Sequence, residues 1–114
     1  MTAKEYLSQI KKLDTQIKNK TFEKKQLEAL SENAGIIKEE IEGLKRKKRK
    51  IISDIEKLNE AEYDILHKRY VQGKTLKEIA AARGSSYSLI TTINSAALQK
   101  IEKIINGANP KARK

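Results

Sequence analysis

The sequence has few of the residues that hold small proteins together by covalent or metal chemistry. Its 114 residues include no cysteine, no tryptophan, one proline, one phenylalanine and one histidine, His67. The lack of cysteine excludes disulfides and thiolate metal sites and favours a reducing compartment. Because His67 has no second histidine or cysteine beside it, we predict no metal site and no cofactor. Aromatic residues make up only 4% of the chain, which predicts a small core.

Long apolar runs and strand patterns are also missing. No run approaches the ~20 apolar residues that cross a bilayer, and Met1–Leu7 lacks the apolar region of a signal peptide. No segment alternates apolar and polar residues as a strand does. No nucleophile–base pair and no phosphate-binding glycine loop is present, so we predict no catalytic residues. These absences predict an all-α, cytoplasmic protein that is not an enzyme and has no membrane partner.

Positive charge is what the sequence has in excess. Lysine and arginine number 25 against 15 acidic residues, a formal net charge of +10. Such a balance predicts attraction to polyanions. The six residues Lys45–Lys50 are all cations, and they cover more than one helical turn, so only some of them can face one partner. We favour a solvated stretch of helix here over a phosphate- or RNA-binding strip.

The N-terminal half predicts two long helices. Residues 2–30 form the first, with Thr2 and Glu5 spaced as a capping box, and residues 31–35 form a turn. The second helix is predicted over 36–58. Seven of its positions are spaced alternately four and three residues apart, and all but Lys48 are apolar: Ile37, Ile41, Leu44, Lys48, Ile51, Ile55 and Leu58. This spacing is typical of a coiled-coil seam. We therefore predict a long antiparallel helical hairpin of coiled-coil type over residues 1–58.

A two-helix hairpin buries little surface by itself, so its apolar stripe needs cover. Either the C-terminal helices or a second copy can supply that cover. The thin hydrophobic content of the chain favours a homodimer through the N-terminal helices. Gly43 lies inside the second helix, where it either weakens the helix, by ~1 kcal/mol relative to alanine, or lets a neighbour approach closely.

Residues 59–105 predict a three-helix unit that ends in a helix–turn–helix. The residues that begin or end its helices are, in chain order, Asn59 with Glu62, Gly73, Thr75 with Glu78, Gly84 and Ser86. Two helices joined by a tight glycine-containing turn are how many proteins present a second helix to the major groove. Double-stranded DNA is therefore the leading partner. Residues 106–114 are predicted to form a basic, disordered tail.

The last helix, from Ser86 to about Ile105, carries the predicted DNA-reading face. Its apolar side is made of Ile90, Ile93, Ala97 and Ile101. The base-reading candidates on the opposite side are Tyr87, Ser88, Thr91, Thr92 and Ser95. Hydroxyl groups can contact base edges, and threonine methyls can meet thymine methyls. The phosphate-binding candidates are Lys68, Arg69, Lys74, Lys77, Arg83, Ser86, Lys100 and Lys103.

These residues also carry a resemblance to a known family. From Leu58 on, the chain resembles region four of bacterial primary-type sigma factors, in the frame Leu58, Glu62, Leu66, Arg69-Tyr70, Gly73, Thr75, Glu78-Ile79-Ala80, Gly84, Ser86, Ile90, Ile93, Ala97-Leu98, Lys100 and Ile101. The whole chain is similar to the RinA and ArpU late-gene transcription regulators of Gram-positive prophages. The resemblance implies a phage-encoded, sigma-like, DNA-binding transcription regulator that can contact RNA polymerase.

The reading helix departs from the family pattern in its lack of charge. Sigma factors place arginines and acidic or amide groups after the cap, whereas no charge lies between Arg83 and Lys100 here. No residue there offers the bidentate arginine–guanine pair, which discriminates by about 1–3 kcal/mol. The sequence therefore predicts sequence-specific or semi-specific regulation. Two alternatives stay open: a small-terminase-like DNA-packaging protein whose coiled coil builds a ring, and an RNA-polymerase-binding assembly protein.

Overall fold

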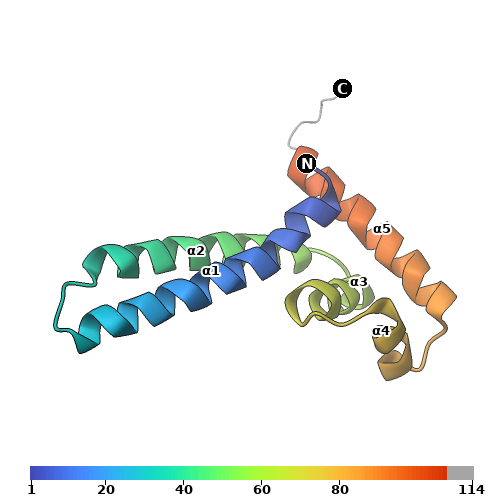
Figure 1. Ribbon diagram of the computed structural model, residues 1–114. Helices are drawn as coiled ribbons and strands as arrows, with labels where there is room; N and C mark the ends of the chain where they lie inside the picture. Colours follow the sequence, from blue (N-terminus) through green and yellow to red (C-terminus); the bar gives the residue numbers. More distant parts are fainter. Residues whose placement is uncertain (108–114) are drawn as a thin grey trace.

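The computed structural model describes residues 1–107 of the protein, and they are helical almost throughout (Figure 1). These residues form five α-helices and one π-helical segment and contain no strand. The predicted all-α fold class is confirmed. Most of the predicted basic tail, residues 108–114, lies outside the described residues.

Helices α1 (Ala3–Ala29) and α2 (Gly35–Ile55) run side by side as a hairpin (Figure 1). A capping box starts α1: Thr2 Oγ1 accepts from the Glu5 N–H at 3.1 Å, and the Glu5 carboxylate accepts from the Thr2 N–H at 2.8 Å. The latter bond holds the pKa of Glu5 below its usual value. In the connecting turn Ser31 has a positive φ of 60°, and Asn33 Oδ1 accepts from the Gly35 N–H. The polar turn residues therefore reverse the chain as the sequence predicts.

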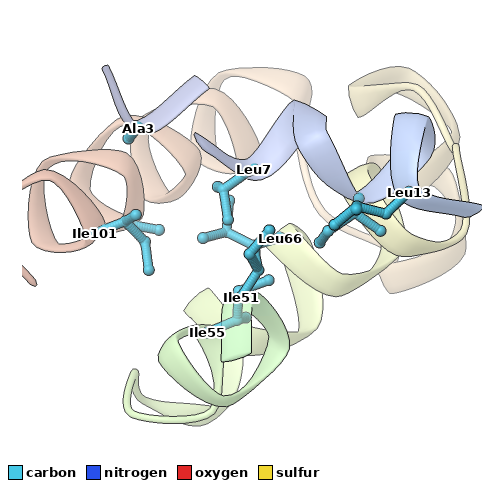
Figure 2. Close-up of a cluster of buried hydrophobic side chains, with 9 residues drawn as sticks. Ala3, Leu7, Leu13, Ile51, Ile55, Leu66 and Ile101 are labelled. Carbon is cyan, nitrogen blue, oxygen red and sulfur yellow. The ribbon is translucent and has the colours of Figure 1, made fainter. Parts of the chain in front are cut away.

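The main hydrophobic core lies where the hairpin meets the C-terminal helices. Figure 2 shows Leu7 of α1 pointing toward Leu66, with Ile51 and Ile55 of α2 on the far side of Leu66. The buried members of this cluster are Ala3, Leu7, Ile10, Leu13, Ile51, Ile55, Leu66, Ala97 and Ile101. They come from both sides of residue 58, the predicted boundary between hairpin and reading unit. C-terminal helices thus cover the base of the hairpin.

Charged residues join α1 to α2 along the seam. Lys48, the one lysine in the predicted heptad pattern, pairs with Asp14 at 2.5 Å, and Lys20 pairs with Glu40 at 3.2 Å. Within the cationic run Lys45–Lys50, three lysines have carboxylate partners: Lys45 pairs with Glu42, Lys48 with Asp14 and Lys50 with Asp54. Of the six residues only Lys48 is half-buried and the others are exposed, as expected for a stretch that wraps around its helix.

A buried carboxylate fastens the base of the hairpin. Asp54 is fully buried and accepts hydrogen bonds from the Tyr6 hydroxyl, from Lys50 Nζ at 2.8 and 2.9 Å and from Lys57 Nζ at 3.0 Å. Burial acts to raise the pKa of Asp54, but the hydrogen bonds from Lys50, Tyr6 and Lys57 outweigh it, so the pKa is lowered. Burial and the same carboxylate raise the pKa of Tyr6. Asp54 therefore stays charged and ties α1 to the end of α2.

The C-terminal unit consists of α3 (Glu60–Leu66), the π-helical segment η1 (His67–Val71), α4 (Leu76–Arg83) and α5 (Tyr87–Asn106). The sequence predicts one plain helix from Asn59 to Gly73, whereas its second half is π-helical, with the Gln72 N–H bonded to the His67 carbonyl five residues back. A second buried cluster joins these helices through Ile65, Ile79, Ala80 and Ile90. This cluster fixes α5 against α3 and α4.

Candidate nucleic-acid interface

The turn between α4 and α5 is specified by local hydrogen bonds. Gly84 has a φ of 66°, which glycine adopts without the steric cost of a Cβ. The Gly84 N–H bonds to the Ala81 carbonyl at 3.2 Å, and the Ser85 N–H bonds to the Ala80 carbonyl at 3.0 Å. This pattern is a Schellman motif, which satisfies carbonyls at the end of a helix. The chain can therefore turn tightly and begin α5 only three residues later.

The starts of α4 and α5 have the predicted caps. Thr75 Oγ1 accepts from the Glu78 N–H at 3.1 Å while the Glu78 carboxylate accepts from the Thr75 N–H at 2.8 Å. The bond from the Thr75 backbone holds the pKa of Glu78 below its usual value. Ser86 Oγ accepts from the Leu89 N–H at 3.1 Å. Because Ser86 uses its oxygen as the cap, its hydroxyl hydrogen remains available to a phosphate at the helix N-terminus.

The inner side of α5 is buried and holds the helix in one orientation. Ile90, Ala97 and Ile101 are completely buried. Ile93, which the pattern predicts to be buried, is only half-buried, while Asn94 is 6% exposed. The Asn94 Oδ1 atom has no hydrogen-bond partner among the described residues. The apolar spacing of the helix does not include Asn94, so no sequence signal could place this amide toward the core.

The outer side of α5 is open to solvent. Ser88, Thr92 and Ser95 are exposed, Tyr87 is 51% exposed and Thr91 is half-buried. The main contact of the hairpin with α5 is near its other end, where the Glu102 carboxylate accepts from the Ala3 N–H. Leu89 is also 50% exposed at the start of α5, and it was not among the predicted reading residues. The five base-reading candidates thus lie on the N-terminal half of α5, which the hairpin of α1 and α2, called the arm from here on, leaves uncovered.

The two threonines have their hydroxyl hydrogens engaged within the helix. Thr91 Oγ1 donates to the carbonyls of Tyr87 and Ser88, both at 2.9 Å, and Thr92 Oγ1 donates to the Ser88 carbonyl at 3.0 Å. Such back-bonding is common for threonine in helices. Each side chain then presents an oxygen lone pair and a methyl group, so the face can accept hydrogen bonds and make apolar contacts.

Three phosphate-binding candidates have carboxylate partners inside the unit. Lys68 and Arg83 both bind Asp64, the lysine at 3.1 Å. Burial acts to raise the pKa of Asp64, but the hydrogen bonds from these two cations lower it. Lys100 binds the buried Glu62 at 2.8 Å. Sequence reasoning missed these pairings because they depend on how α3 lies against α4 and α5.

The remaining cationic candidates have no such pairing. Lys74, Lys77 and Lys103 are exposed, and no ion pair joins them to a carboxylate within residues 1–107. Arg69 is half-buried, with its guanidinium 5.6 Å from the centre of the Tyr70 ring. Lys74 and Lys77 lie on either side of the cap that starts α4. The unpaired cations therefore gather mainly around the start of the helix–turn–helix.

Other kinds of site find no support in the described part of the chain. No group of three or more metal-ligating side chains occurs among these residues. His67 lies 5.3 Å from Tyr63 between ring centres, and its Nδ1 is 3.3 Å from Gln72 Nε2. None of the described helices is long and apolar enough to span a membrane.

Comparison with known families gives one match. Residues 55–103 match the family described as Sigma-70, region 4. The match covers α3, η1, α4 and most of α5, the part of the chain that carries the resemblance to sigma factors, and it leaves nearly all of the hairpin out. Comparisons with curated proteins and with solved structures found no match. The C-terminal unit is thus similar to a DNA-binding helix–turn–helix domain of the sigma-70 region 4 type.

Proposed function

We propose that the protein is a DNA-binding transcription regulator that places α5 in the major groove of duplex DNA. The observation that supports this most directly is the outer face of α5. Its hydroxyl groups are exposed on a helix whose start is capped and whose inner side is fixed by a buried cluster. A helix held in one orientation with a polar outer face is what reading of base edges requires.

The chemistry of this face favours semi-specific reading. The lone pairs of Thr91 and Thr92 can accept from adenine N6 or cytosine N4, and their methyl groups can pack on thymine methyls. Arginine, which would discriminate guanine most strongly, is missing from the outer face. Phosphate contacts then supply most of the affinity. Lys74, Lys77 and Lys103 are the first choices for these contacts, because Lys68, Arg83 and Lys100 would have to leave Asp64 and Glu62.

The setting that we propose comes from the resemblance to the RinA and ArpU regulators. It is sigma-like control of late transcription by a phage-encoded protein in the host cytoplasm, with RNA polymerase as a second partner. The proposal includes a homodimer through the N-terminal helices, and the exposed Leu30 and Ile36 at the hairpin tip support it. Two reading helices would then address half-sites about one turn of duplex apart, or a multiple of it.

A second candidate is an assembly protein that binds RNA polymerase without reading DNA. The half-exposed Tyr87 and Leu89 at the start of α5 favour it, because each offers apolar surface beside the turn to a protein partner. Failure to bind any duplex at low salt, together with capture of polymerase subunits, would identify this function. The number of copies in the particle, measured by light scattering, separates regulation from DNA packaging. A dimer agrees with regulation, whereas a ring of many copies agrees with packaging.

The proposed reading face is tested by selecting bound sequences from a random duplex pool. The wild-type protein should enrich a motif, and Thr91→Ala/Thr92→Ala should lose it. Thr91→Val/Thr92→Val keeps a methyl group but removes the acceptor, so it should lose only positions that donate to oxygen. Ser53→Ala is the matched control, since the Ser53 hydroxyl also donates to a backbone carbonyl on an exposed helix, but on α2.

The outcome depends on the motif rather than on affinity alone. Loss of the motif in the alanine variant, with the motif unchanged in Ser53→Ala, supports reading by α5. A motif that is the same in all four proteins would show that the outer face of α5 does not read the bases.

A further inference from the structure

A stripe of lysines runs along the exposed side of α1. Lys4, Lys11, Lys18 and Lys25 recur every seven residues, and all four are exposed. The residues between them at heptad spacing, Ser8, Thr15 and Phe22, are exposed as well. A seven-residue repeat keeps side chains on one face of a helix that packs as a coiled coil. The stripe is about 32 Å long at 1.5 Å per residue.

The middle of this lysine stripe forms one wall of a groove against the helix–turn–helix unit. The groove has a volume of about 580 Å³. Ser8, Lys11, Thr15 and Lys18 line it from α1, and Arg69 and Lys74 line it from the end of η1 and the following loop. Lys74 is also one of the unpaired cations at the start of α4. The groove therefore joins the basic side of α1 to the basic margin of the reading unit.

Within residues 1–107, no ion pair joins the four cations that line this groove, Lys11, Lys18, Arg69 and Lys74, to a carboxylate. Among the residues that the structure describes, Asp14 is the one carboxylate that lines the groove, and it is bound by Lys48. Elsewhere on the hairpin, cations such as Lys20 and Lys50 have carboxylate partners. Like charges on both walls of a groove repel one another and concentrate a positive potential there. An external polyanion is the ligand that such an arrangement suits.

We infer that this groove and the lysine stripe bind the sugar–phosphate backbone of the same duplex that α5 reads, beyond the base pairs that α5 contacts. The inference rests on the proposed function, and it gives the arm a DNA-binding role. One strand of B-form duplex has a phosphate about every 3.4 Å along the axis. A stripe about 32 Å long therefore matches roughly one further turn of duplex. The hydroxyls of Ser8 and Thr15 can donate to phosphate oxygens between the lysines.

The test compares binding to two duplexes: a short one that carries the selected motif, and the same duplex extended by one turn on each side. The wild-type protein should bind the extended duplex more tightly. Lys11→Gln/Lys18→Gln should remove that gain and lower the slope of log affinity against log salt by roughly 1.8, about 0.9 for each lost contact. Lys38→Gln/Lys47→Gln is the control. It removes the same charge from exposed positions on α2 outside the groove.

The results separate this inference from the proposed function. If wild-type binds the motif but Lys11→Gln/Lys18→Gln behaves like the control on both duplexes, the arm inference is wrong and reading by α5 stands. If wild-type binds neither duplex at low salt, both fail. Tighter binding of a single strand than of the extended duplex, with sensitivity to Phe22→Ala, would also overturn the inference, because an exposed aromatic can stack on unpaired bases.

Discussion

The base and the tip of the hairpin both carry large apolar residues, but in different environments. At the base, Leu7, Ile10 and Ile55 are completely buried under the C-terminal helices. At the tip, Phe22, Leu30 and Ile36 are 64%, 70% and 78% exposed. The buried hydrophobic residues there are Ala34 and Ile41. Whether a large apolar residue of the hairpin is buried thus depends on its place relative to the C-terminal helices, which cover the base and not the tip.

The contrast also separates two roles within one arm. The base is part of the same core as α5, so it supports the reading helix. The tip and the lysine stripe extend beyond that core and present apolar and basic groups to solvent. The arm can therefore reach a partner without disturbing the orientation of α5.

The largest expected difference comes from the same substitution at the two ends of the hairpin. Leu7→Ala should lower the free energy of unfolding by about 2–5 kcal/mol, because it leaves a cavity in the main core. Leu30→Ala should change it by less than about 0.5 kcal/mol as long as the protein is a single chain, because the rest of that chain leaves the side chain exposed. Urea unfolding followed by circular dichroism measures both.

The same pair of variants also tests self-association through the tip. If Leu30→Ala costs as much as Leu7→Ala, the tip is covered in solution by a second chain. That result would support the proposed homodimer and would make the unfolding midpoint depend on protein concentration. Equal midpoints over a hundredfold range of concentration, with Leu30→Ala near zero, would show that the hairpin tip is free.

A second comparison concerns the carboxylates that join α1 to α2. Asp54→Asn should lower the free energy of unfolding by about 1–3 kcal/mol, because the amide cannot satisfy Tyr6, Lys50 and Lys57 as the charged group does. Asp14→Asn removes a half-exposed pair with Lys48 and should cost below about 1 kcal/mol. Equal losses in the free energy of unfolding would mean that the buried Asp54 stabilises the fold no more than the half-exposed Asp14 does.

The effect of Asp54 should depend on pH with a definite sign. A carboxylate whose pKa is lower in the folded chain stabilises the fold fully above its unfolded pKa of about 3.9. That contribution is lost as pH falls through the lowered value in the folded chain. Wild-type stability should therefore fall below about pH 5, and Asp54→Asn should fall less steeply. Urea titrations at several pH values measure the two slopes, and parallel curves would contradict the assignment.

The features that could be predicted from the sequence are those that neighbouring residues determine. Thr2, Asn59, Thr75 and Ser86 each cap a helix as predicted, and Gly84 ends α4 with a positive φ. A cap needs only one side chain and the backbone three residues away, so its spacing is visible in the chain.

The features that could not be predicted depend on contacts between distant segments. Asn94 is buried and Ile93 only half-buried because α5 is rotated slightly from its apolar pattern when it packs. Lys68 and Arg83 share Asp64 only once α3 lies beside α4. The lysine stripe is polar, so a search for apolar faces does not find it. The groove beside it forms only where α1 packs near the loop after η1. Sequence patterns list charged residues, but packing decides which of them keep a free charge.

The last comparison concerns two glycines, one in the hairpin and one in the helix–turn–helix, whose substitutions should change stability in opposite directions. Gly43→Ala should raise the free energy of unfolding by about 0.5–1 kcal/mol. A Cβ there would meet only Arg46 Nη2, at 3.7 Å, so no neighbour in the chain needs the space. Gly84→Ala should lower it by about 1–2 kcal/mol, because an L-residue is strained at a φ of 66°. Thermal unfolding measures both signs. A loss of stability in Gly43→Ala that grows with protein concentration would instead show a second chain packed against α2, and the hairpin would then have cover along its length.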